Sequence, residues 1–123
     1  MTSKYVHSRI ASFGYALKGI SLFYRTQANA RIQFLAALLA IGFGVWLKIS
    51  FLEWTVIIMC IAMVLAAELL NTAIETLADA VDMNPNIQIG MAKDLAAGSV
   101  LITSIGSALM GGLIFIPKII ALC

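Results

Sequence analysis

The chain has 123 residues, of which 62% are hydrophobic and only 11% are charged. A soluble domain usually carries about 25% charged residues, so this chain has too few charges to cover a surface exposed to water. The composition therefore predicts an integral membrane protein with a single domain, residues 1–123. A net charge of +2 is too small to favour a nucleic acid partner, and two cysteines make neither a disulfide framework nor a metal-binding set.

The first segment, residues 1–27, is predicted to be an amphipathic helix that lies in the membrane interface. Its apolar residues follow the three-then-four spacing of one helical face: Ile10, Phe13, Leu17, Ile20 and Tyr24. Lys4, Lys18 and Arg25 border this face, and long basic side chains in that position can reach lipid headgroups. The alternative is a helix packed on a soluble core, for which the rest of the sequence offers little material.

Three apolar stretches follow, and each is long enough to cross a bilayer core, which needs about 20 helical residues. We expect membrane helices at residues 28–50, 51–82 and 94–120. A short turn joins the first two, and residues 83–90 are predicted to form a loop because they contain Asn, Pro and Gly. The predicted fold class is an all-α membrane protein with an N-terminal amphipathic surface helix and three transmembrane helices.

Basic residues are concentrated before the first apolar stretch, at Lys4, Arg9, Lys18, Arg25 and Arg31. Because cytoplasmic segments are enriched in Lys and Arg, the N-terminal segment is expected to lie in the cytoplasm. Three crossings then place residues 83–90 in the cytoplasm, and residues 48–53 and Cys123 on the opposite side.

The second predicted membrane helix carries a polar face at its cytoplasmic end. At about 100° per residue, its polar side chains occupy a sector of roughly 100°: Glu68, Asn71, Thr72, Glu75, Asp79 and Asp82. An ionisable residue at membrane depth costs at least a few kcal/mol, so Glu68 at the membrane boundary is a candidate site residue. The alternative is a solvated helix end outside the bilayer, which fits Asp79 and Asp82 better than it fits Glu68.

Carboxylates one helical turn apart repel one another, and a divalent cation would remove that repulsion. Mg²⁺ is usually held by one or two carboxylates together with water and phosphate oxygens. The polar face therefore predicts Mg²⁺ and a phosphorylated partner. Lys93, beyond the predicted loop, offers a positive charge for phosphate, although it could instead extend its ammonium group to the membrane interface. The sequence contains no nucleotide-binding motif of the soluble type.

Two runs of sequence resemble a known family. The first, residues 68–79, reads ELLNTAIETLAD, and the second, residues 93–98, reads KDLAAG. Both resemble the prokaryotic diacylglycerol kinase and undecaprenol kinase family. Further matching residues extend the resemblance over nearly the whole chain: Gly14, Tyr15, Lys18, Gly19, Asn29 and Arg31.

The resemblance implies a homotrimer whose active sites are shared between neighbouring subunits. It also implies an ATP-dependent lipid kinase in the bacterial inner (plasma) membrane, with an active site that faces the cytoplasm. Such an enzyme transfers the γ-phosphate of ATP to the hydroxyl of a membrane lipid alcohol, in phospholipid or cell-envelope lipid recycling. Diacylglycerol and undecaprenol both stay open as the substrate, and residues 53–54 and 115–118 look more like the undecaprenol kinase branch.

The resemblance also implies roles for individual residues. By position, Glu68 looks like the catalytic base and Glu75 like a ligand of Mg²⁺. Asn71 and Asp79 look like site-organising residues. The implied nucleotide-binding residues are Tyr15, Glu75, Asn84, Asn86, Lys93 and Asp94.

This sequence departs from the family pattern in two places. The family usually has an acidic, metal-binding residue where this chain has Gln27, whose neutral amide is a weaker metal ligand. The loop at residues 84–86 lacks the acidic-aromatic-His pattern that the family usually has near the nucleotide.

Two other function classes compete with the kinase hypothesis. A small cation-binding channel or transporter subunit would use the acidic face as a pathway, but a pathway must continue across the bilayer and residues 54–67 offer no charged group. A purely structural assembly protein would leave the acidic face unexplained. The sequence therefore favours the lipid kinase.

Overall fold

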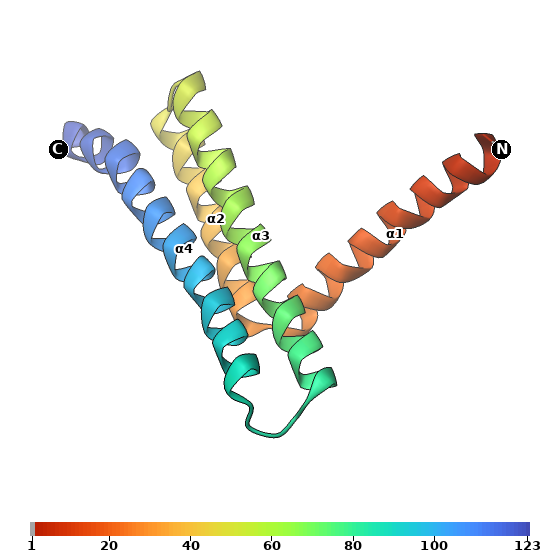
Figure 1. Cartoon of the computed structure of the whole chain (residues 1–123). Coiled ribbons are helices and arrows are strands. Elements are labelled where there is room, and N and C mark those ends of the chain that lie inside the picture. Colours follow the sequence, from red (N-terminus) through yellow and green to blue (C-terminus); the bar gives the residue numbers. More distant parts are fainter. Residues whose placement is uncertain (1) are drawn as a thin grey trace.

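The computed structural model describes residues 2–123, which form four helices joined by short connections (Figure 1). The helices are α1 (Thr2–Thr26), α2 (Ala28–Leu47), α3 (Phe51–Val81) and α4 (Ile87–Leu122). Helices α2, α3 and α4 lie side by side in alternating directions, and each is long and apolar enough to cross a membrane. The predicted class, an all-α membrane protein with an N-terminal helix and three membrane helices, is confirmed.

Helix α1 diverges from the bundle formed by the other three helices (Figure 1). Near its C-terminal end, Phe23 is buried at the joint with the bundle, with only 2% of its surface exposed. Farther out, Ile10, Phe13 and Leu17 are 62%, 73% and 67% exposed. These apolar side chains are free to contact lipid, as an interfacial helix requires, and they do not pack on a soluble core.

The turn between α2 and α3 is tight and well capped. Lys48 adopts a left-handed conformation (φ 53°) that ends α2. Ser50 then begins α3 with a capping box, in which its hydroxyl accepts from the Glu53 amide and its own amide donates to the Glu53 carboxylate. Lys118 of α4 lies 3.0 Å from the same carboxylate, so an ion pair joins α3 to α4 at this end of the bundle.

The connection between α3 and α4 is shorter than the sequence predicts. We expected a loop through Gly90, but α4 begins at Ile87. The reason is a local cap: the side-chain oxygen of Asn86 accepts from the backbone amides of Gln88 and Ile89, at 2.9 and 3.2 Å. The third membrane helix therefore starts before the expected residue 94 and includes Gly90 in its first turns.

Small and apolar side chains fill the contacts between the helices. The buried residues include Ala30, Ile49, Ile57, Val64, Ala67, Ala78 and Ala96. Helices α2 and α3 pack tightly at Gly44, where an added Cβ atom would lie 2.8 Å from the Trp54 ring. Most large apolar side chains on the outer faces of the bundle are exposed, which suits contact with lipid rather than with water.

Candidate functional site

The polar face of α3 changes from buried to exposed along the helix. Glu68 is 6% exposed, Asn71 is half-buried, and Glu75 and Asp79 are exposed. Spacings of three and four residues place all four side chains on one face. The face therefore leads from a carboxylate within the bundle to carboxylates that solvent or a ligand can reach.

Glu68 is the one buried charged residue among those that the structure describes. Neither of the two ion pairs formed within residues 2–123 includes it. A buried carboxylate without a cationic partner is costly, and such groups cluster at functional sites. This geometry makes Glu68 the strongest candidate on the face for a group that exchanges a proton.

Asn71 lies between Glu68 and Glu75 on this face, about one turn from each. The Asn71 amide nitrogen donates to the Glu75 carboxylate at 3.5 Å, which is a long hydrogen bond. The Asn71 side-chain oxygen is buried and finds no hydrogen-bond partner within residues 2–123. An acceptor left in this state suits a donor or a cation that a ligand would bring.

Lys93 and Asp79 meet across the α3–α4 connection. The Lys93 ammonium lies 2.7 Å from Asp79 Oδ1, and the two side chains are 38% and 52% exposed. The structure thus brings Lys93 to the acidic face of α3. Asp94 is exposed on the first turns of α4, next to Lys93 in sequence.

The loop asparagines have local structural roles in this chain. Asn86 caps α4 through its side-chain oxygen, and the backbone amide of Asn84 donates to Asp82 Oδ1 at 2.9 Å. Both asparagines are exposed near the base of α4. Their contact with a nucleotide stays a prediction.

The two predicted site residues from the N-terminal part lie on α1 and at the junction of α1 and α2, not on α3. Tyr15 is 70% exposed on the diverging helix α1. Gln27 is half-buried between α1 and α2, and its side chain makes no cap hydrogen bond to α2. One chain alone therefore does not bring Tyr15 to Glu68.

The donor set fits a hard cation held by few protein ligands. Residues 2–123 contain no group of three or more His, Cys, Asp or Glu side chains gathered closely enough to hold a metal ion. The groups that lie together are oxygen donors: the Glu75 carboxylate and the unpartnered oxygen of Asn71. Mg²⁺ needs only one or two carboxylates when phosphate and water complete its shell, so these residues suit Mg²⁺ bound together with a phosphorylated ligand.

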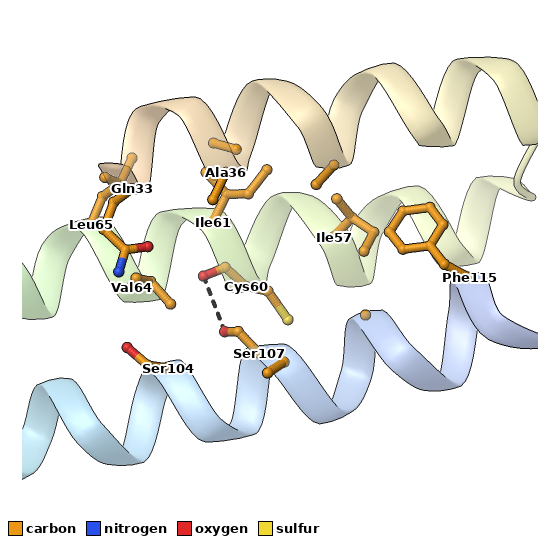
Figure 2. Close-up of a pocket in the computed structure, with 14 residues that line it drawn as sticks. Gln33, Ala36, Ile57, Cys60, Ile61, Val64, Leu65, Ser104, Ser107 and Phe115 are labelled. Carbon is orange, nitrogen blue, oxygen red and sulfur yellow. Dashed lines mark hydrogen bonds between the residues drawn. The ribbon is translucent and has the colours of Figure 1, made fainter. Parts of the chain in front are cut away.

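Sequence reasoning missed a cleft of about 300 Å³ between α2, α3 and α4 (Figure 2). Its walls are mostly small and apolar, but Gln33 of α2 and Ser104 of α4 both point into it. Ser107 lies deeper, where its hydroxyl donates to the Cys60 carbonyl at 3.4 Å. The signal available in the sequence was Gln33 itself, a polar residue within an otherwise apolar stretch.

Comparison with known proteins gives one consistent result. The chain matches the family described as prokaryotic diacylglycerol kinase over residues 14–115. It is 36% identical over 108 residues to an undecaprenol kinase from Bacillus subtilis (strain 168), covering 88% of each chain. It is 31% identical over 96 residues to a diacylglycerol kinase from Escherichia coli (strain K12), covering 78% of this chain and 79% of that one.

A third relative is longer than this chain. A diacylglycerol kinase from Synechocystis sp. (strain ATCC 27184 / PCC 6803 / Kazusa) is 32% identical over 114 residues, which cover 92% of this chain and 65% of the relative. The family match over residues 14–115 includes the acidic face of α3 and the start of α4.

Proposed function

Because this chain belongs to the prokaryotic diacylglycerol kinase family, we propose that it is a membrane lipid kinase that transfers the γ-phosphate of ATP to the hydroxyl of diacylglycerol or undecaprenol. The observation that carries the assignment of the site is Glu68, a buried carboxylate at the end of an apolar helix stretch and the start of an exposed acidic face. A lipid hydroxyl and a water-soluble nucleotide can meet only at such a boundary. Residues 1–123 act as a single kinase domain.

Glu68 accepts the proton of the lipid hydroxyl as the reaction begins. The hydroxyl oxygen forms a bond to the γ-phosphorus, and the bond from that phosphorus to the β–γ bridging oxygen breaks. ADP leaves with the electron pair of that bond. Phosphoryl transfer depends mainly on positioning and charge stabilisation, so one correctly placed base is the principal chemical group required from the protein.

The exposed part of the face binds the nucleotide and its metal ion. Glu75 and Gln27 would hold Mg²⁺, which would supply positive charge beside the phosphate groups. Lys93 pairs with phosphate, and Asp79 fixes the position of its ammonium group. Asn71 organises the site between the base and the metal ligand. The further nucleotide contacts are Tyr15, Asn84, Asn86 and Asp94.

The protein acts as a homotrimer with sites completed between subunits. Two observations support this. Tyr15 lies on a helix that diverges from its own bundle, and α1 exposes a row of large apolar side chains. A neighbouring copy would bring the first to a polar face and cover part of the second.

The active site faces the cytoplasm from the bacterial inner membrane. The basic residues of α1 support this orientation, because positive charge favours the cytoplasmic side. The alternative of a cation channel or transporter finds no support in the family, since the relatives are named as kinases.

The test is phosphate transfer by the purified protein in mixed micelles. ATP labelled in the γ-phosphate is supplied with diacylglycerol, with undecaprenol or with no added lipid, and label is measured in the extracted lipid. We expect label in the phosphorylated alcohol and none in the lipid fraction of the third sample. Hydrolysis of ATP without transfer to either alcohol would contradict the proposed function.

A further inference from the structure

The cleft between α2, α3 and α4 lies on the same face of α3 as the candidate base, Glu68. Ile57, Ile61 and Val64 line its α3 wall, and Glu68 follows Val64 on the same face. Val64 and Glu68 are both buried, at 7% and 6% exposure. Four residues, about 6 Å of helical rise, separate them along the axis. A lipid whose hydroxyl lies at Glu68 therefore has its next few atoms at the mouth of this cleft.

Polar groups lie at the end of the cleft nearest Glu68. Figure 2 shows the Gln33 amide and the Ser104 hydroxyl directed into the space from α2 and α4, beside Val64 and Leu65. Deeper in the cleft, the walls are Ala40, Ile57 and Phe115. The cleft thus combines hydrogen-bond donors near the base with an apolar interior, which is the order of groups in a lipid with a polar backbone and a hydrocarbon tail.

We propose that the cleft holds the glycerol ester region and the first part of one chain of a diacylglycerol, and that Gln33 determines substrate class by donating to an ester carbonyl. This inference rests on the proposed kinase function and extends it to the choice of alcohol. Diacylglycerol carries ester carbonyls close to its free hydroxyl, whereas undecaprenol carries only methyl branches and double bonds there. A polyprenol in the same position leaves the Gln33 amide without a partner, and an unpaired polar group in an apolar site is unfavourable.

Of the residues that look like the undecaprenol kinase branch, Phe115 lines the apolar end of the cleft away from Glu68 and carries no hydrogen-bond donor in its side chain. Glu53 and Lys118 form an ion pair at the end of the bundle opposite Glu68, and Glu53 also caps α3. Their roles are accounted for by structure. The polar groups that can meet the substrate close to Glu68 are those of the cleft.

The experiment compares three alcohols that differ in one feature at a time. A 1,2-diacylglycerol and its 1,2-dialkyl ether analogue have the same shape, but the ether lacks the carbonyl oxygens. Undecaprenol is the third. We expect the wild-type protein to prefer the diacyl over the dialkyl lipid by about tenfold in kcat/KM, the usual range for one hydrogen bond to a buried group.

Gln33→Met removes the amide and nearly preserves the volume of the side chain. We expect it to lower kcat/KM for the diacyl lipid by about tenfold, to leave the KM for ATP unchanged, and to reduce the diacyl-to-dialkyl preference towards one. Phe115→Leu, at the far end of the cleft, is the matched control and should keep that preference. Ser104→Ala removes the hydroxyl at the same end of the cleft, and the diacyl-to-dialkyl preference is measured for this variant too.

The outcomes separate this inference from the proposed function. Phosphorylation of none of the alcohols would overturn both. Phosphorylation with equal kcat/KM for the diacyl and dialkyl lipids, or with a preference that Gln33→Met leaves intact, would overturn the role of Gln33 and retain the kinase. A wild-type preference for undecaprenol over diacylglycerol would likewise overturn the assignment of substrate class.

Discussion

The ammonium group of Lys93 lies 2.7 Å from Asp79 Oδ1, and this contact joins the last turns of α3 to the first turns of α4. The two residues belong to the two sequence runs that carry the family resemblance. Their contact brings the two runs together in space, because it places the Lys93 ammonium group beside the acidic face of α3. The pair is exposed enough that its net contribution to stability should be small, in the range of about 0–1 kcal/mol.

We predict that Lys93→Met reduces activity far more than it reduces stability. Loss of the phosphate-pairing charge should raise the KM for ATP at least about tenfold, the value of one charge-assisted hydrogen bond. Thermal unfolding in micelles should shift little. The matched control is Lys118→Met, which breaks the ion pair with Glu53 at the opposite end of the bundle. Equal kinetic losses in the two variants would show that Lys93 acts through packing of α3 on α4.

Gly44 gives a prediction about packing. An added Cβ would lie 2.8 Å from Cη2 and 3.0 Å from Cζ2 of Trp54, and 3.1 Å from Ile49 Cδ1. The Trp54 ring is rigid, so Gly44→Ala should destabilise the bundle by about 1–3 kcal/mol through overpacking. Gly42→Ala on the same helix is the control, because its Cβ would meet nothing within 4 Å. Unfolding of both variants in detergent is the measurement, and equal stability would contradict the close packing of Trp54 on Gly44.

The helices and the acidic face could be predicted because their signals are local. Long apolar runs predict spans by length alone, and the spacing from Glu68 to Asp79 fixes one face of one helix. The Asn86 cap was harder to predict, because Asn, Pro and Gly also favour loops, and the side-chain oxygen of Asn86 decides the boundary.

The cleft and the Gly44–Trp54 contact could not be predicted in the same way. Both depend on how α2, α3 and α4 pack, which is set by small residues far apart in the sequence. The direction of α1 relative to the bundle also depends on non-local contacts. The sequence pattern of α1 predicts an apolar face, but not whether the bundle covers that face. The roles of Tyr15 and Gln27 stay predictions, because no hydrogen bond or ion pair within residues 2–123 joins either side chain to the polar face of α3.

We predict that Gln27→Glu lowers the Mg²⁺ concentration needed for half-maximal activity. A carboxylate binds Mg²⁺ more strongly than a neutral amide does. The change also adds a negative charge at the N-terminus of α2, which stabilises a helix by about 0.3–1 kcal/mol in any case. Ala28→Glu adds the same charge at the next residue and serves as the control. A lower Mg²⁺ requirement in both variants, or in neither, would show that Gln27 does not bind the metal ion.

The last prediction separates the roles of two carboxylates on this face, Glu68 and Glu75. Glu68 is buried and lies next to the intramembrane cleft, whereas Glu75 is exposed and accepts from Asn71. As a base, Glu68 acts mainly in the transition state. Glu68→Gln should therefore lower kcat by about 10²–10⁴-fold and leave the apparent affinities for ATP and Mg²⁺ nearly unchanged.

Glu75→Gln should behave differently, because a metal ligand contributes to binding as well as to rate. We expect a higher KM for Mg·ATP together with a lower kcat. Glutamine nearly matches glutamate in shape, so both variants should stay folded, and size-exclusion chromatography with thermal unfolding checks this. Steady-state kinetics in micelles across ATP and Mg²⁺ concentrations then gives the comparison. Near-normal kcat in a folded Glu68→Gln protein would remove Glu68 as the base. The same pattern of KM and kcat in both variants would instead show that the two carboxylates act as one unit. Removing either member of such a unit has the same effect on the kinetics.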